Sequence, residues 1–261
     1  MEISISMESS ITTREEVLKK RNNLLENLLT EPQTKAQLIE NTGRSRSTID
    51  RGIKSLQEQG CVQYKNGRYH ITQTGKISHK EYTRHRQVLQ GIEEANEILK
   101  ELPSQPTIST QFIKNINVNV ADPKAPGIVL KESYGLVREA DQLFRLAPVI
   151  MPAFSKNLLE TVKKSETSIE VVIEADVLDT VEKEDDSEVS TIIAHPNTTF
   201  HKFDGELPFS LWITKGDQDY VGINMYNQDG LLGVLINKSE EAVSWGISTF
   251  ENYRKQSTHY D

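Results

Sequence analysis

Two helices, a tight turn and a β-hairpin are predicted by residues 34–75, which read TKAQLIENTGRSRSTIDRGIKSLQEQGCVQYKNGRYHITQTG. Thr34 and Ser45 are suited to cap successive helices, because a side-chain oxygen at this position can accept a backbone N–H of the first turn. Gly43 supplies the turn between these helices. A single buried stripe on the second of them, at the i, i+4, i+7 spacing of an amphipathic helix, consists of Ile49, Ile53 and Leu56.

The flanking residues extend this pattern in both directions. Gly60 ends the helix, in the role that a left-handed residue has at a helix C-terminus. Asn66-Gly67 lies between two β-prone runs, which is the strongest short-range signal of a hairpin. A preceding helix is predicted from a Thr13 cap to about Leu29, and a long helix from about residue 74 to 102. This order of elements is that of the winged-helix version of the helix-turn-helix.

The third helix of this order has a basic outward face. Arginine can bond guanine bidentately in the major groove, and Ser, Thr and Lys can hold phosphates. The N-terminal end of a recognition helix points into the groove, so residues 44–48 are expected to reach base edges. The predicted DNA contacts are Arg44, Ser45, Arg46, Ser47, Thr48, Arg51 and Lys54 on this helix, with Lys65 and Arg68 at the hairpin tip.

A solvated surface helix is the alternative interpretation of the same face. Any exposed helix carries charges, and Asp50 and Glu58 lie on or near this face. The order of the elements and the basic hairpin tip favour DNA binding over that alternative. The two acidic residues are expected to lower non-specific affinity.

Composition and charge are consistent with two domains of different function. The chain has 261 residues, and one cysteine, Cys61, excludes an internal disulfide framework and a Cys-rich zinc site. Residues 1–86 hold 15 Lys and Arg against 10 Asp and Glu, whereas the rest is strongly acidic and the whole has a net charge of -8. This asymmetry indicates a nucleic-acid-binding part joined to another part. No apolar run is long enough to cross a membrane, and no secretory signal is recognised, so a cytoplasmic location is expected.

Residues 34–56 resemble the helix-turn-helix of archaeal, particularly haloarchaeal, winged-helix transcriptional regulators. The junction after the hairpin, Tyr69-His-Ile-Thr-Gln-Thr-Gly75, is similar to theirs. The resemblance covers about residues 13–100 and implies double-stranded DNA as a partner. In such families the helix after the hairpin often carries the dimer contact.

The long helix carries an apolar seam with steps of four and three residues, which lasts about two heptads. The seam consists of Val88, Ile92, Ala95, Leu99 and Leu102. A homodimer is the first interpretation, because operators of helix-turn-helix proteins usually have two half-sites. Packing on the protein's own core is the alternative, and two heptads do not decide between them.

The C-terminal part is predicted to be an α/β sheet domain. Prolines at positions 103, 106, 123 and 126 mark a linker. The predicted domains are therefore residues 13–102 and 128–257, with a linker at 103–127. A helix is predicted over 154–164, and strand candidates at 168–174, 199–203, 209–214, 220–225 and 231–236 precede a closing helix at 240–256. Together the two domains give an α+β protein.

Residues 125–257 resemble the middle domain of a methanogenesis regulator. The closest segments are Phe209–Thr214, Tyr220–Tyr226, Leu231–Ile236 and the closing helix with Trp245 and Tyr253. Such domains look like half of a phospholipase-D-type fold and are used as effector sensors. The chemistry of that fold needs His-x-Lys-x(4)-Asp, and the chain has no such motif. The resemblance therefore implies a sensor or dimerisation domain, with an unspecified small-molecule effector.

Other chemical signals in the chain are weak. His195, His201 and Asp204 do not have a known zinc spacing, and neither a cofactor nor a metal is predicted. Cys61 is expected to be a small buried residue rather than a redox sensor, and Trp212 and Trp245 to be core residues rather than ligand stackers.

The predicted function is that of a dimeric, sequence-specific transcriptional regulator and not of an enzyme. The alternatives are a winged helix that binds protein partners, and an enzyme acting on a phosphodiester or a sugar.

Overall fold

The computed structural model describes residues 2–105, 108–150, 156, 158–162, 167–184, 187–227 and 230–260. The chain folds into two compact units, Met1–Gln87 and Val88–Asp261, and the division falls inside helix α4, Gln73–Leu99. Helices dominate the first unit and a large sheet dominates the second, so the chain has the α+β character predicted. Among the described helices, none combines the length and apolarity that a membrane crossing requires.

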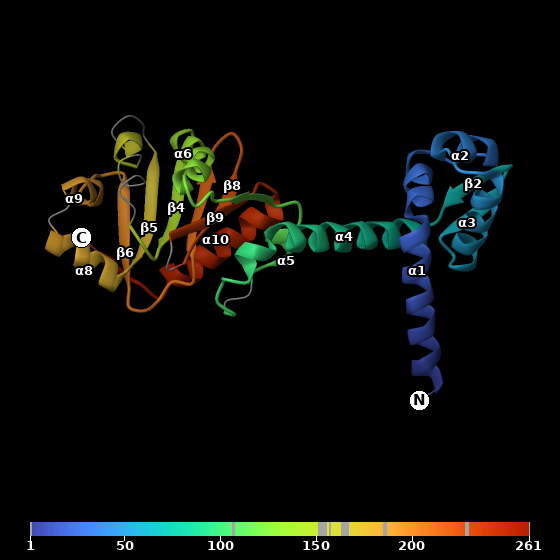
Figure 1. Cartoon of the computed structure of the whole chain (residues 1–261), viewed down its shortest axis with the longest axis horizontal. Helices are drawn as coiled ribbons and strands as arrows, with labels where there is room; N and C mark the ends of the chain where they lie inside the picture. Colours follow the sequence, from blue (N-terminus) through green and yellow to red (C-terminus); the bar gives the residue numbers. More distant parts are fainter. Residues whose placement is uncertain are drawn as a thin grey trace. The chain divides into compact units, whose positions relative to one another are not determined.

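The first unit has the predicted order of three helices, a hairpin and a fourth helix (Figure 1). Its elements before α4 are α1 (Glu2–Thr30), α2 (Lys35–Thr42), α3 (Arg46–Glu58), β1 (Val62–Lys65) and β2 (Arg68–Ile71). Its core is an apolar cluster from all these helices and the start of β1, including Leu25, Leu28, Leu38, Ile49, Ile53, Leu56 and Cys61.

Local signals place the turns of this unit. Thr34 caps α2 in a capping box with Gln37, and Gly43 follows α2 in the left-handed conformation, with φ of 64°. Gly60 is also left-handed, and Asn66 and Gly67 have φ of 53° and 79° between β1 and β2. Two successive positive φ values are those of a type I′ hairpin turn, as the Asn-Gly pair predicts.

The predicted start of the first helix at Thr13 is wrong, because α1 begins at Glu2. Residues 2–12 contain neither proline nor glycine, and an existing helix extends at low cost where nothing interrupts it. Thr12 donates its hydroxyl to the carbonyl of Glu8 at 3.0 Å, a bond within one helix.

The second unit is an eight-stranded sheet in the order β10-β6-β5-β4-β7-β8-β9-β3. β4, β5 and β6 are parallel neighbours, and the other pairs are antiparallel (Figure 1). The strands are β3 (Asn117–Val120), β4 (Gln142–Ala147), β5 (Ser168–Glu174), β6 (Thr198–Phe203), β7 (Ser210–Lys215), β8 (Tyr220–Asn227), β9 (Gly230–Asn237) and β10 (Thr258–Tyr260).

Helices contribute to an apolar cluster on each face of this sheet. One cluster joins the sheet to the end of α4, to α5 (Thr110–Ile113) and to α10 (Glu240–Arg254). The opposite cluster joins it to α6 (Leu130–Arg138), α8 (Ala175–Glu184) and α9 (Ser187–Ile193), and the short 3₁₀ helix η1 (Pro126–Val129) precedes α6. Of the predicted helix at 154–164, residues 156 and 158–162 are described and helical, and the rest of the range lies outside the described residues.

Part of the range predicted as a linker is folded into the second unit. Within 103–127, α5 and β3 form, and β3 pairs with β9 at the edge of the sheet. The buried Asn237 side chain donates to the carbonyls of Phe112 and Lys114, both at 2.8 Å. The linker prediction failed because a partner more than 110 residues away stabilises the short strand, which proline punctuation does not reveal.

The apolar seam of α4 packs on the core of its own chain. Val88 and Ala95 are buried in the cluster with α5 and α10, and Leu99 and Leu102 pack against it. Ile92, the remaining member, is 41% exposed. The seam therefore packs on the protein's own core, which was the alternative interpretation. A homodimer stays a prediction, and its contacts would need a surface other than this seam.

Candidate nucleic-acid interface

Helix α3 presents the predicted DNA-contact residues on its solvent side. Arg44, Ser45 and the first α3 residues up to Ser47 are exposed, as are Arg51 and Lys54, whereas Thr48 is half-buried. The opposite side packs closely on α1, since a Cβ on Gly52 would lie 2.6 Å from the Leu24 Cδ1 atom. This contact orients the outward face, and Gly52 is buried on the same side as the predicted stripe of Ile49, Ile53 and Leu56.

Ser45 caps α3. Its Oγ atom accepts the backbone N–H of Thr48 at 3.3 Å and is 2.9 Å from the Thr48 hydroxyl and 3.2 Å from the Ser47 hydroxyl. These bonds satisfy a donor at the start of the helix. Ser45 therefore has a positioning role for the residues on either side of it, in addition to any contact with phosphate.

We expect Ser45→Ala to lower the free energy of unfolding by about 1 kcal/mol, because the helix loses its N-cap acceptor. Urea denaturation of the full chain, followed by circular dichroism, measures this loss. Ser47→Ala is the matched control, since within the described residues the exposed Ser47 hydroxyl forms a hydrogen bond only with the Ser45 hydroxyl. Equal stability of Ser45→Ala and wild type would contradict the capping role.

Two arginines at the start of α3 are available for an external partner. Within the described part of the chain, the guanidinium groups of Arg44 and Arg46 form neither a hydrogen bond nor an ion pair. Arg51 Nε, in contrast, donates a hydrogen bond to the carbonyl of Ser47 at 3.3 Å. Lys54 Nζ forms an ion pair with Glu58 Oε1 at 4.0 Å. The uncompensated positive charge is therefore concentrated at the N-terminal end of α3.

An ion pair neutralises the acidic residue in the middle of this face. Lys35 Nζ lies 2.5 Å from Asp50 Oδ1, and the hydrogen bond to Asp50 raises the pKa of Lys35. The pair joins α2 to α3. Because Lys35 compensates the charge of Asp50, this carboxylate repels a phosphate backbone less than an unpaired one would.

The hairpin residues Lys65 and Arg68 are both exposed, but they differ in their contacts. The Arg68 Nη1 atom donates to the carbonyl of Pro32 at 3.0 Å and to Gln37 Oε1 at 3.3 Å. Gln33 and Tyr69 exchange backbone hydrogen bonds of 3.1 and 2.8 Å beside it. Arg68 thus fixes the hairpin against the connection between α1 and α2, which no local sequence signal indicates.

The weaker sequence candidates belong to other elements of the chain. His201 is bonded to Glu170 at 2.8 Å rather than to His195, and the described residues hold no group of three metal-ligating side chains. Cys61 is buried, and burial raises the pKa of its thiol, which disfavours the reactive thiolate. Trp212 is buried and Trp245 packs on Phe112 with ring centroids 4.9 Å apart, so both are core residues.

Family models match both halves of the chain. Residues 126–256 match the family model of the methanogenesis regulatory protein FilR1, middle domain, and residues 16–106 match that of the HVO_A0261 N-terminal domain. No curated protein sequence matches the chain.

Solved structures resemble the chain only distantly. TrmBL2, an archaeal chromatin protein with a novel mode of DNA binding, is 12% identical over 94% of this chain and 98% of its own, with a TM-score of 0.44. Nuc, a phospholipase D family member from Salmonella typhimurium, is 13% identical over 56% of this chain and 97% of its own, with a TM-score of 0.43. Similarities at this level say nothing about activity.

Proposed function

The chain belongs to the family defined by the middle domain of the methanogenesis regulatory protein FilR1, and from this we propose that it is a sequence-specific DNA-binding transcriptional regulator. The observation that carries the proposal is the pair of exposed arginines, Arg44 and Arg46, with no ionic partner in the described chain at the N-terminal end of a capped helix. The N-terminal match over residues 16–106 supports assigning DNA binding to the first unit.

The first unit acts in this proposal as a winged helix. α3 enters the major groove, where Arg44 and Arg46 contact base edges and Arg51 and Lys54 contact phosphates. The hairpin reaches the adjacent backbone with Lys65, and Arg68 keeps it in place. Neutralisation of Asp50 by Lys35 removes a repulsive charge from the surface that faces the DNA.

The second unit acts as a sensor, and the protein as a homodimer. The chain lacks the His-x-Lys-x(4)-Asp motif of phospholipase D chemistry, which favours regulation over catalysis for the sheet domain. A small molecule would change DNA affinity only if it binds the two arrangements of the dimer with different affinities. The seam residues of α4 are used within the chain, so dimer contacts are assigned to other surfaces.

Hydroxyl-radical footprinting on the promoter of the protein's own gene tests both the binding to DNA and the two-fold symmetry of the proposed dimer. We expect two protected segments whose centres are roughly 34–36 Å apart, or a multiple of this spacing, because each subunit of a dimer occupies one half-site. A single protected segment would contradict the dimer. Complete absence of protection would favour the alternative in which the winged helix binds a protein partner.

A further inference from the structure

Helix α10 carries a strip of uncharged residues along one side. Trp245, Ser248 and Asn252 follow each other at steps of three and four residues, so they lie on the same side of the helix. Ser248 and Asn252 are exposed and Trp245 is half-buried. The strip borders a hollow of about 410 Å³ lined by Trp245, Ser248, Thr249, Asn252, Tyr253 and Gln256. None of these six residues is charged, although Lys, Arg, Asp and Glu make up 26% of the chain.

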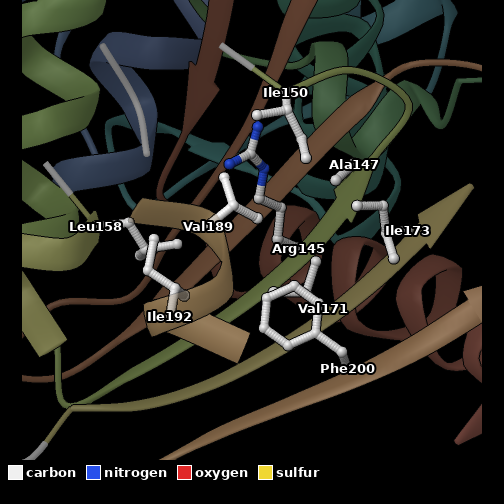
Figure 2. A pocket seen from close by; sticks show the side chains of 9 residues that line it. All are labelled: Arg145, Ala147, Ile150, Leu158, Val171, Ile173, Val189, Ile192 and Phe200. Atoms are coloured by element: carbon white, nitrogen blue, oxygen red, sulfur yellow. The ribbon is translucent and has the colours of Figure 1, made fainter. Parts of the chain in front are cut away.

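The opposite face of the sheet has a cavity of a different kind. It measures about 30 Å³ and is lined by Arg145 and eight apolar side chains, which Figure 2 shows around it. Such a volume has room for little more than a water molecule, so this cavity belongs to the packed interior of the unit. The hollow beside α10, in contrast, has room for side chains of another protein surface.

The hydroxyl groups of the strip are suited to burial. Ser248 Oγ donates to the carbonyl of Ser244 and Thr249 Oγ1 donates to the carbonyl of Trp245, each at 2.9 Å. Because both donors are already paired within α10, another helix can cover them without leaving them unsatisfied. The indole N–H of Trp245 and the side-chain amide of Asn252 form no hydrogen bond in the described part of the chain, so both are available to a partner.

Charges of opposite sign lie at the two ends of the strip. Glu241 is in the first turn of α10, Lys255 is its C-cap residue, and both are exposed. The steps from Glu241 through the strip to Lys255 are four, three, four and three residues, so both charges lie on the side of the strip. Within the described residues neither forms an ion pair, whereas Glu251 and Arg254 pair with each other at 2.7 Å.

We propose that this strip is a dimer contact, in which α10 packs antiparallel on α10 of a second copy of the chain, around a two-fold axis at Ser248. The positions along the strip are symmetric about this residue. Glu241 and Lys255 lie seven residues before and after it, and Trp245 and Asn252 lie three before and four after it. Glu241 therefore faces Lys255 of the partner subunit, and Trp245 faces Asn252 of the partner subunit.

A second copy is the partner that this order of residues fits. An isologous contact requires two halves that complement each other, and a helix side that is acidic, then uncharged, then basic provides them when paired antiparallel. The facing indole and amide can bond as Trp212 Nε1 and Asn224 Oδ1 do within the chain, at 3.0 Å. An aromatic residue among uncharged side chains, with charges at the margin, is also the composition of a protein interface. This inference rests on the proposed function and deepens it, because it names the surface of the homodimer.

Sedimentation equilibrium of the full chain at low salt, over a series of concentrations, tests the contact. We expect Glu241→Lys to weaken the association of two copies by roughly tenfold or more, since two attractive pairs become two repulsive ones. Glu240→Lys is the matched control and should associate like wild type, because its position lies 100° around the helix from Glu241. Both variants lose the same acidic charge from the first turn of α10, so a difference between them reports the contact and not the stability of the helix.

Exchange of the two charges tests the antiparallel pairing. Lys255→Glu alone should weaken association as Glu241→Lys does, and the variant that carries both changes should regain it. An equimolar mixture of the two single variants should also associate, because both ion pairs between unlike chains then join opposite charges. Wild type that stays monomeric, equal weakening by Glu240→Lys, or a mixture that associates no better than the single variants would overturn the contact.

DNA footprinting on the same preparations separates this inference from the proposed function. Protection of the promoter by a dimer that neither charge reversal weakens would overturn the α10 contact alone. Association that follows the charges as expected, without DNA protection, would overturn the proposed function and leave the α10 contact standing.

Discussion

Replacing Arg44 and Arg46 together by alanine is expected to weaken binding to the operator by roughly 30-fold or more. Each bidentate contact between an arginine and a base contributes about 1–3 kcal/mol of discrimination, and 1.4 kcal/mol corresponds to a factor of ten. Both guanidinium groups are exposed and have no partner within the described chain, so no internal bond is lost. Fluorescence anisotropy with the footprinted duplex measures the change, and the free energy of unfolding should stay within about 0.5 kcal/mol of wild type.

Lys19→Ala with Lys20→Ala is the matched control for this variant. It removes the same charge from exposed positions of the same unit, but on α1. If only the net charge of the first unit mattered, the two double variants would lose affinity equally. Such equality would contradict the assignment of base contacts to the start of α3.

Trp212→Ala is expected to lower the free energy of unfolding of the second unit by about 3–5 kcal/mol. The side chain is 1% exposed and lies over Gly222, where an added Cβ would be 2.2 Å from the indole ring. Its Nε1 donates to Asn224 Oδ1 at 3.0 Å, so removal of the indole leaves both a cavity and a buried amide oxygen without this donor. Urea denaturation followed by circular dichroism measures the loss.

Trp245→Ala serves as the comparison, because this indole is only half-buried on α10. We expect a smaller loss for it, since less apolar surface returns to water. A loss below about 1 kcal/mol for Trp212→Ala would mean that the indole is not a packed core residue, and it would revive the interpretation of this tryptophan as a ligand-stacking group.

The first unit could be predicted closely because its signals are local. Caps at Thr34 and Ser45 and the Asn66-Gly67 turn each act within four residues, and all three form as expected. Reliance on local signals also explains the error at the start of α1. Thr13 can act as a cap, but no proline or glycine before it prevents the helix from beginning at Glu2. The resemblance to archaeal regulators was confirmed by the family matches in both halves.

The features that sequence patterns missed depend on contacts between distant residues. Arg68 bonds to the carbonyl of Pro32, and Asp50 pairs with Lys35, so neither is simply a surface charge. β3 requires β9, more than 110 residues later. Gly91 permits α4 to approach α5, since a Cβ there would lie 2.2 Å from the carbonyl oxygen of Ile113. The heptad spacing of α4 does not reveal that the partner of its apolar stripe belongs to the same chain.

Anisotropy titration of wild-type protein onto its own promoter and onto a scrambled duplex, at three salt concentrations, tests the central claim most directly. The account predicts tighter binding to the promoter at every salt concentration, with log K falling by roughly 0.9 per neutralised phosphate for each tenfold increase in salt. Equal affinity for the two duplexes, or no binding to either at low salt, would contradict a sequence-specific regulator.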